Sequence, residues 1–218
     1  MTENTVDKLA LNQNVNAILH FWFGEDAADI VEDRGQMWFA GGAAIDQQIK
    51  AQFSQSVMAA AHDELSAWRN APTGCLALIL LLDQFTRNIF RGTAKAFASD
   101  ALVVDICKTG LASAFDKQLT LSQRVFFYLP LEHSESLADQ ELCVELFTEL
   151  AEDAAKKYGE QYQRLFAGYI DYAVEHRDII LKYGRFPHRN KVLDRKSTQA
   201  ELDYLNQGGT SFGQDDSS

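Results

Sequence analysis

The sequence predicts an all-α protein, a single-domain array of about eight or nine helices. Apolar residues recur at a spacing near 3.6 residues, and convincing two-residue alternation, which would indicate strands, is absent. Only 3 prolines occur in 218 residues, so helices can run long without interruption. Because no linker or low-complexity block divides the chain, residues 1–206 are expected to form one helical domain, and residues 207–218 a flexible C-terminal tail.

Apolar faces define the longer expected helices. A first helix covers residues 15–23 and ends at Gly24. The next, of about 20 residues, has an inward face made by steps of four, at Ile45, Ile49, Phe53, Val57, Ala61 and Leu65. Two later helices end near Gly159 and at Gly184, with seams that contain Cys143, Phe147, Leu150 and Ala154 in one and Tyr162, Phe166, Tyr169, Ala173, His176 and Ile180 in the other.

Capping residues mark the remaining helices. Thr73 is expected to cap a helix from Gly74 to about residue 90, and Ser99 a helix to about residue 108 that Gly110 ends. Pro130 is expected to bend or end the helix that precedes it, since proline lacks the backbone N–H. Two capping boxes begin further helices, at Thr120 with Gln123 and at Thr198 with Glu201.

Composition and charge exclude several classes of function. The net charge of −11 argues against nucleic-acid binding, which needs a basic surface. The longest apolar run, residues 75–82, is too short to span a membrane, and the N-terminus lacks the pattern of a signal peptide. A cytoplasmic location is therefore expected. Residues 182–196 nevertheless carry six Lys or Arg and one acid, Asp194, which favours a small anionic ligand.

Three polar clusters are candidates for the functional site. The first follows an all-apolar helical stretch and places Asp83, Arg87 and Arg91 four residues apart, on one helix face, with Gln84 and Asn88 beside them. An exposed Asp–Arg pair at a helix end would explain the same spacing. The second cluster follows Pro130 and contains Glu132, His133, Ser134 and Glu135. A Glu–His pair can serve acid–base chemistry, but it is also common at helix ends.

The third cluster is a loop at the end of a helix. Arg185, His188, Arg189 and Asn190 present many hydrogen-bond donors within six residues, which suits a carboxylate or a phosphate. The same loop could instead cap carbonyl groups or pair with acidic helices. His176, in an apolar seam, is expected to be a hydrogen-bonded core histidine. No metal site and no cofactor are predicted, because Glu132, His133, His176 and His188 lack ligand spacing and the common catalytic and nucleotide-binding motifs are absent.

Four motifs in this order resemble a widespread bacterial protein family, also found in some eukaryotes, that is known as a domain of unknown function. They are FWFG at 21–24, LLDQFTRNIFRG at 81–92, FYLPLEHSE at 127–135 and GRFPHRN at 184–190, and the resemblance covers residues 14–206. It implies an all-helical, tetratricopeptide-like array and no known activity. Two departures concern the loop geometry: Asp194 stands where the family often has Gly, and Gln199 where it often has Pro.

These observations leave three hypotheses. The first is binding of an anionic small molecule or a peptide carboxylate, by Gln84, Arg87, Asn88, Arg91, Arg185, His188, Arg189 and Asn190. The second is a hydrolase or transferase in which His133 or His188 is the general base and Glu135 or Asp83 orients it. The third is a structural role, with the polar motifs as a buried network. The sequence leaves open whether the protein is an enzyme, and also its oligomeric state.

Overall fold

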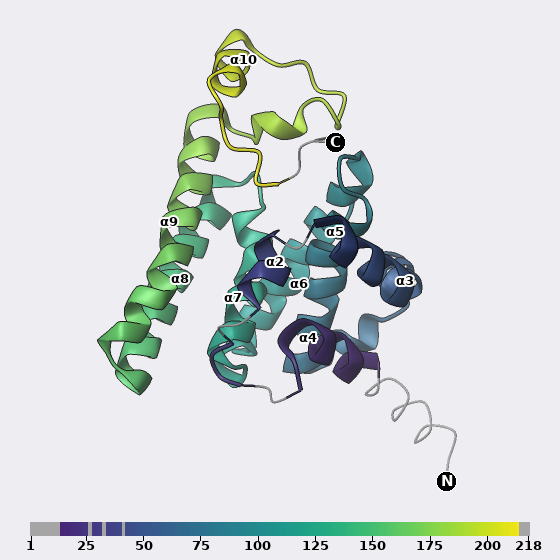
Figure 1. Ribbon diagram of the computed structural model, residues 1–218, viewed down its shortest axis with the longest axis vertical. Helices are drawn as coiled ribbons and strands as arrows, with labels where there is room; N and C mark the ends of the chain where they lie inside the picture. Colours follow the sequence, from purple (N-terminus) through teal and green to yellow (C-terminus); the bar gives the residue numbers. More distant parts are fainter. Residues whose placement is uncertain (1–13, 26–27, 32–33, 41, 214–218) are drawn as a thin grey trace.

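The computed structural model describes residues 14–25, 28–31, 34–40 and 42–213, and within these ranges it contains helices and no strand (Figure 1). Residues 14–23 are helical. The later α-helices are α2 (Gly35–Ala40), α3 (Gly42–Ala61), α4 (Pro72–Ile79), α5 (Thr86–Ile89), α6 (Asp100–Ala112), α7 (Leu121–Glu132), α8 (Leu137–Tyr158), α9 (Glu160–Tyr183) and α10 (Gln199–Asn206). The all-α prediction is confirmed, whereas the tetratricopeptide-like detail remains a prediction.

Shorter helical segments connect these helices. Four are 3-10 turns: η1 (Ser66–Asn70), η3 (Ala94–Phe97), η4 (Asp116–Gln118) and η5 (Pro187–Arg189). The segment η2 (Leu80–Phe85) is a π-helix between α4 and α5. None of the described helices is both long and apolar enough to cross a bilayer.

The helix at residues 14–23 anchors the aromatic core. Gly24 ends it as predicted, with φ at +92° and its N–H donating to the His20 carbonyl at 2.8 Å. Trp22 is fully buried and packs with ring centroids 5.3 Å from Phe85 and 5.5 Å from Phe126. This first helix therefore holds both η2 and α7 against the core.

Helix α3 confirms the predicted helix and corrects the end of its face. Ile49, Phe53 and Val57 are buried as expected. Ala60 is the last buried residue, however, while Ala61 is exposed and Leu65 lies beyond the helix. The helix ends one turn earlier than the steps of four suggest, because Asp63 takes a positive φ of 61°.

The central buried helix begins one residue before the predicted cap. Ala71 is the N-cap and Pro72 is the first residue of α4, so Thr73 does not cap this helix. Proline suits the first helical position, where its missing N–H is not needed. Gly74 is required here for a different reason: a Cβ would lie 2.5 Å from the Trp68 carbonyl oxygen.

The chain stays helical from α4 through η2 and α5 to Ile89, and every residue of η2 is buried. A π-helical turn is wider than an α-turn and is often found at functional sites. Here it includes Asp83, which is 0% exposed. An isolated carboxylate at this depth would be costly, so its partners define the interior polar site described below.

Helix α6 continues past Gly110, which the sequence predicted to end it. Ser99 is the N-cap, although its side chain makes no capping hydrogen bond, and the helix runs to Ala112. Gly110 is a packing residue, because a Cβ there would lie 2.6 Å from Phe127 Cζ and 3.0 Å from Cys75 Sγ. The glycine lets α6 approach α7 and α4 closely.

We expect Gly110→Ala to lower the free energy of unfolding by about 1–2 kcal/mol, because overpacking costs more than the helix propensity that alanine adds. The matched control is Gly168→Ala on α9, where nothing lies within 4 Å of an added Cβ. This control should gain roughly 0.5–1 kcal/mol. Urea unfolding of both variants measures the difference, and equal shifts of the same sign would show that Gly110 is not a packing glycine.

Helix α7 also runs further than predicted. Its capping box is confirmed, with Thr120 Oγ1 accepting from the Gln123 N–H and the Gln123 side chain accepting from the Thr120 N–H. Pro130 neither ends the helix nor starts a turn, since α7 continues to Glu132. All twelve residues of α7 are buried, so packing from surrounding helices outweighs the hydrogen bond that proline cannot make.

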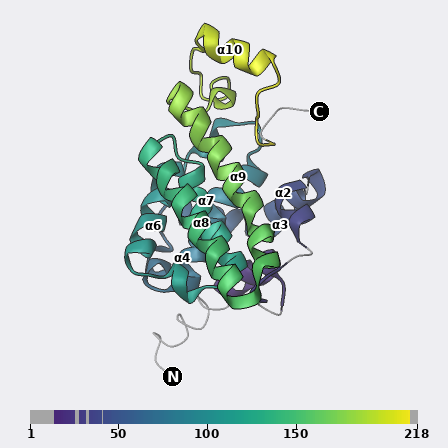
Figure 2. The same ribbon diagram turned by 90° about the vertical axis from the view of Figure 1, so that its left-hand side faces the viewer.

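Helices α8 and α9 form a long hairpin that packs along α7 (Figure 2). Gly159 joins them with φ at +102°, and Gly184 ends α9 in the left-handed conformation, as predicted. The predicted seam of α8 is buried, at Cys143, Phe147, Leu150 and Ala154. At its C-terminal end the hairpin carries the loop with η5 and the short α10.

The C-terminal segment folds back toward α9. The second capping box is confirmed at Thr198 and Glu201. Asp194, where the resembling family often has glycine, has a φ of +51°, a conformation that glycine adopts most easily. Residues 207–213 contact α9, since Thr210 pairs with Glu175, while residues 214–218 lie outside the described part. The single domain and the flexible tail remain predictions.

Candidate functional site

A contact between Asp83, which is fully buried, and His133, which is partly buried, joins the first two predicted clusters. Asp83 lies in η2, and His133 directly follows the last residue of α7. The Nδ1 atom of His133 lies 2.7 Å from Asp83 Oδ1, and Gln84 Nε2 donates to Asp83 Oδ2 at 2.5 Å. Burial alone would raise the pKa of the Asp83 carboxyl, but the charge of Arg87 and the hydrogen bonds from His133 and Gln84 hold it below its usual range.

This contact sets the protonation of the imidazole. Because Asp83 is ionised, the hydrogen bond places a proton on Nδ1 of His133 and leaves the lone pair on Nε2. Burial lowers the pKa of His133, although the Asp83 charge opposes this shift. A neutral histidine oriented by a carboxylate can accept a proton or bind a metal ion.

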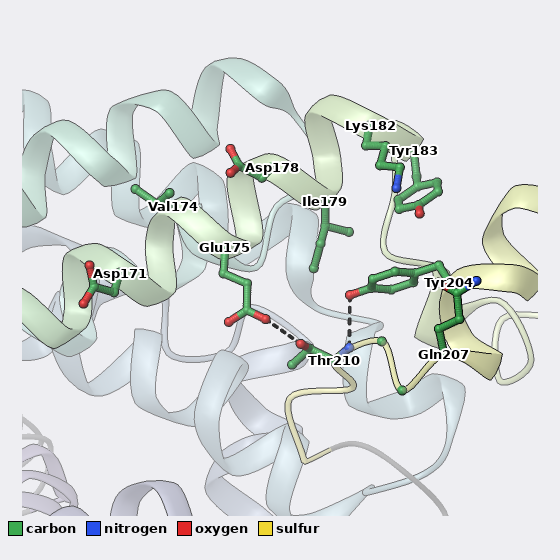
Figure 3. Close-up of a pocket in the computed structure, with 12 residues that line it drawn as sticks. Asp171, Val174, Glu175, Asp178, Ile179, Lys182, Tyr183, Tyr204, Gln207 and Thr210 are labelled. Carbon is green, nitrogen blue, oxygen red and sulfur yellow. Dashed lines mark hydrogen bonds between the residues drawn. The ribbon is translucent and has the colours of Figure 1, made fainter.

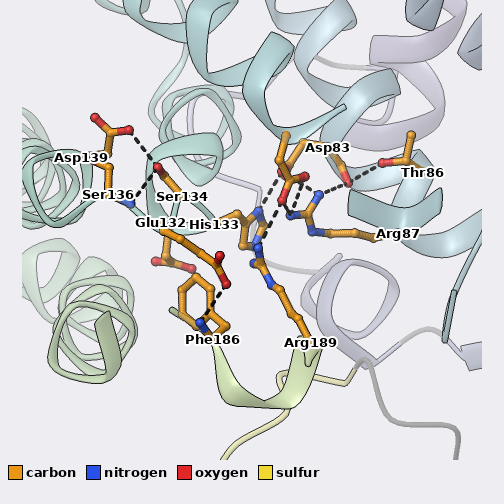
Figure 4. Close-up of polar contacts among 12 residues, drawn as sticks. Asp83, Thr86, Arg87, Glu132, His133, Ser134, Ser136, Asp139, Phe186 and Arg189 are labelled. Atoms are coloured by element: carbon orange, nitrogen blue, oxygen red, sulfur yellow. Dashed lines mark hydrogen bonds and ion pairs between the residues drawn. The ribbon is translucent and has the colours of Figure 1, made fainter. Parts of the chain in front are cut away.

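Two arginines extend the cluster. Arg87 Nη1 lies 3.0 Å from Asp83 Oδ1, and its Nη2 lies 3.0 Å from Asp100 Oδ1. Arg189, from η5, reaches Asp100 Oδ2 at 3.2 Å. Figure 4 shows its side chain extending toward His133 and the Asp83–Arg87 pair. Segment 83–91 and loop 185–190 therefore meet through Asp100, as the anion-binding hypothesis requires.

A small cavity lies where these groups converge. Its volume is about 30 Å³, enough for about one water molecule. Seven residues line it: Arg87, Phe97, His133, His176, His188, Arg189 and Phe212. The predicted residues Arg87, His133, His188 and Arg189 are thus brought together at one closed site.

The remaining histidines of the cavity are held neutral. Burial, aided by neighbouring positive charge, lowers the pKa of His176 and of His188 to about 3 each. Burial and the charge of Arg87 also lower the pKa of Arg189 to about 10, although Asp100 opposes this. At neutral pH the cavity therefore has two guanidinium cations and three uncharged imidazoles on its walls.

Two predicted ligand-binding residues point elsewhere. Asn88 Nδ2 donates to Asp46 Oδ1 at 2.7 Å, and Arg91 Nε donates to Asp46 Oδ2 at 2.9 Å. Asp46 lies on α3, so these residues tie α5 to α3 and do not line the cavity. Arg91 also donates to the Gly213 carbonyl at 2.7 Å, which holds the C-terminal segment.

Two others belong to the framework of the loop. Arg185 Nε donates to Glu201 Oε1 at 2.6 Å, on the outer side of the loop. Asn190 donates to Ser197 Oγ at 3.1 Å and accepts from Arg195 Nε at 2.9 Å. Both residues hold the connection between α9 and α10 in place, and neither lines the cavity.

Glu135, the proposed orienting acid, also serves this framework. It accepts from Arg195 Nη1 at 2.7 Å and from the Phe186 N–H at 2.8 Å. Ser134 in the same motif donates to Asp139 Oδ2 at 2.8 Å. Of the two acids proposed to orient a histidine, Asp83 does so in the structure, at His133.

The chain is similar to one protein family and to one solved structure. A family model described as "Bacterial protein of unknown function (DUF924)" matches residues 18–209. The chain belongs to this family. A solved structure, described as that of a protein of unknown function, ATU0120 from Agrobacterium tumefaciens, is 35% identical, with a TM-score of 0.74. The match covers 90% of this chain and 99% of that one. No curated protein matches the chain.

Two residues that line the cavity each have a buried polar atom without a partner among the described residues. These atoms are Nε of Arg189 and Nδ1 of His188. Arg189 is 5% exposed, so solvent does not satisfy its Nε–H, and its Cζ atom lies 4.3 Å from the Phe186 ring centroid. Unpaired buried donors are rare in native proteins and call for a ligand, a water molecule or an ion.

Several residues of this site carry too little sequence signal to be selected. Asp100 bridges both arginines, but as the first residue of α6 it resembles an ordinary helix-start acid. Phe97 and Phe212 line the cavity without belonging to any polar motif. His176 gave a signal, an imidazole in an apolar seam, and it is hydrogen-bonded as expected, with Nδ1 donating to the Tyr172 carbonyl at 2.8 Å.

A larger hollow lies on the outer side of α9 (Figure 3). It has a volume of about 650 Å³ and is open to solvent, between α9 and residues 204–210. Asp171, Glu175 and Asp178 line it, against Lys182 as its one lining cation. An acidic groove repels an anionic ligand, so this larger hollow is not the anion-binding site that the sequence predicts.

Proposed function

We propose that this protein binds a small anionic molecule, through a carboxylate or phosphate group, at the cavity between α5, α9 and η5. The observation that supports this proposal most directly is the buried, unpartnered Nε–H of Arg189, a residue that lines the cavity. An anionic oxygen is the natural acceptor for a guanidinium N–H, and such charged hydrogen bonds are the strong ones. His188 Nδ1 and the guanidinium of Arg87 lie at the same cavity.

The charges of the site favour an anion over a cation. Arg87 and Arg189 share the carboxylate of Asp100. Burial, together with the repulsive charge of Arg87, lowers the pKa of Arg189. A bound anion would relieve this repulsion between buried cations. The neutral imidazoles beside them can donate or accept hydrogen bonds without adding charge.

Access requires movement of Phe212. The cavity in its present form is too small for a carboxylate group with its substituent. Phe212 stacks on His176 with ring centroids 3.7 Å apart, and its backbone has a φ of +52°. A non-glycine residue in this conformation is strained by about 1 kcal/mol, which lowers the cost of moving it. Phe212 is thus the side chain whose displacement would open the cavity to a ligand.

A thermal-shift panel of inorganic phosphate and small carboxylates tests the proposal. Wild type should be stabilised by at least one of them, and Arg189→Ala should bind it 10–100-fold more weakly, because a charged hydrogen bond contributes roughly 1.5–3 kcal/mol. The matched control is Arg177→Ala, since Arg177 is on α9 but pairs with its neighbour Asp178 away from the cavity. Phe212→Ala should increase the response by enlarging the entrance.

The outcome that contradicts the proposal is a shift of equal size in wild type and Arg189→Ala, or none at millimolar concentrations even in Phe212→Ala. In that case the structural hypothesis gains, since most donors of the cluster are already paired internally. The acid–base hypothesis rests on a different observation, the 2.7 Å contact of His133 with Asp83. Catalysis, a cytoplasmic location and the absence of nucleic-acid binding remain predictions.

A further inference from the structure

We propose that Glu132, His133 and His176 form a binding site for one divalent transition-metal ion of the zinc type. These residues come from the end of α7 and from the middle of α9, so the fold brings together ligands that are 43 residues apart in the sequence. One ligand atom from each lies within 4.8 Å of the other two. This inference departs from the expectation that the chain has no metal site, and it does not rest on anion binding.

Both histidines have the hydrogen bonds that orient a metal ligand. Nδ1 of His176 must donate to the Tyr172 carbonyl at 2.8 Å, because a carbonyl oxygen can only accept. Nδ1 of His133 faces the ionised carboxylate of Asp83 at 2.7 Å. The lone pair of each ring is therefore on Nε2, available to a metal ion. Histidine ligands in metalloproteins typically show this second contact to a carboxylate or a carbonyl.

Glu132 supplies the third, anionic ligand. It is 6% exposed, and its carboxylate lies 3.8 Å from His176 Nδ1, an atom that already donates to Tyr172. A buried carboxylate without a cation is costly, and among the described residues no lysine or arginine pairs with Glu132. A divalent cation would supply the missing charge. Two imidazoles and one carboxylate are the protein ligands of several catalytic zinc sites, which keep a fourth position for water or substrate.

The surroundings allow a cation despite the nearby arginines. Arg87 and Arg189 face the same cavity, but Asp83 and Asp100 neutralise them. Metal–ligand distances near 2.1 Å place ligand atoms roughly 3.4 Å apart, so ligand atoms that now lie within 4.8 Å of one another would have to close by up to about 1.4 Å. His188 lines the cavity but lies outside the set of converging ligand atoms, and we assign it no metal contact. While a metal ion is bound, His133 cannot serve as a general base.

The test uses the tag-free full chain after treatment with EDTA, in a buffer without phosphate. Calorimetric titration with ZnCl₂ should show one ion per chain, and Co²⁺ should give the visible bands of a tetrahedral complex. His176→Ala and the isosteric Glu132→Gln should each weaken Zn²⁺ binding by 100-fold or more. Asp83→Asn, which removes no ligand, should weaken it by about 10–100-fold, as expected for a residue that orients a ligand.

Two controls separate this site from other sources of binding. His20→Gln changes an exposed histidine near the N-terminus and should leave Zn²⁺ affinity unchanged. Arg189→Ala removes the proposed anion contact and should also retain Zn²⁺ binding, so either proposal can fail without the other. The metal site is rejected if Co²⁺ gives no tetrahedral spectrum, or if both His176→Ala and Glu132→Gln, shown to be folded by circular dichroism, bind Zn²⁺ as wild type does.

Discussion

Replacing Asp83 with Asn is expected to lower the free energy of unfolding by about 3–5 kcal/mol, because it removes the anion from a buried, paired cluster. Asp83 is fully buried between Arg87 and His133. In the variant, Arg87 keeps only Asp100, and the imidazole loses the carboxylate that fixes its proton on Nδ1. An amide can still hydrogen-bond at the same place, but it brings no charge. Chemical denaturation at pH 7 measures the loss.

The matched control is Asp46→Asn, which also separates an aspartate from an arginine, Arg91, in the turn just after α5. This pair is partly exposed, so its loss should cost about 1 kcal/mol or less. The effect of Asp83→Asn also has a definite pH dependence. Because the pKa of Asp83 is lowered on folding, its contribution is complete above the ordinary value of 3.8 and is lost as the pH falls below it. Equal losses for both variants, or a loss that persists at low pH, would contradict this account.

The helical architecture could be predicted because its signals are local. A capping box requires two residues three positions apart, and both boxes form as predicted, at Thr120 and Thr198. The glycine at 184 ends α9 in the conformation that glycine favours. The errors arise where a distant contact overrides the local signal. Gly110 lies inside α6, where Phe127 packs so closely that it leaves no room for a side chain. Pro130 is tolerated inside α7 because the whole helix is buried.

The candidate site could be predicted only in part, for the same reason. The spacing of the first cluster predicted that Asp83, Arg87 and Arg91 share one helix face. The structure pairs Asp83 with Arg87 and brings them to Arg189 and His133, whereas Arg91 lies beyond α5 and pairs with Asp46. The sequence could not indicate which of these hydrogen-bond donors would pair with acidic residues of other helices. Asp46 takes up Arg91 and Asn88, and Asp100 bridges the arginines of the cavity. Local patterns identify polar residues, but only the fold decides their partners.

His133 is the residue at which the functional hypotheses compete. Its Nδ1 is committed to Asp83, so a single lone pair on Nε2 remains for a proton, a ligand or a metal ion. His176 has the same arrangement with a carbonyl acceptor, and Glu132 lies beside both. A general base needs one such imidazole, whereas a metal site needs several that converge. The pairing of two oriented imidazoles with a buried acid therefore favours the metal over proton transfer.

Replacing Glu132 with Gln is expected to stabilise the metal-free protein, by about 3 kcal/mol at pH 7, taking 1.36 kcal/mol for each unit of pKa. Burial, with the charges of Asp83 and Glu175, raises the pKa of Glu132 from 4.5 to about 8. The folded protein must therefore keep this carboxyl protonated, while the unfolded chain ionises it. Wild type loses stability as the pH rises from 4.5 toward 8, and the neutral amide does not.

Urea unfolding of EDTA-treated wild type and Glu132→Gln at pH 5, 6, 7 and 8 measures this effect, and the difference should grow with pH. Glu145→Gln is the control. Because Glu145 is exposed to solvent, the stability difference between this variant and wild type should not grow with pH. A difference that is constant with pH would show that Glu132 is not a buried neutral acid. Added Zn²⁺ should reverse the order of stability, since the ion stabilises only the chain that retains the carboxylate. A carboxylate that destabilises the metal-free protein and stabilises the Zn²⁺-bound protein behaves as a metal ligand does.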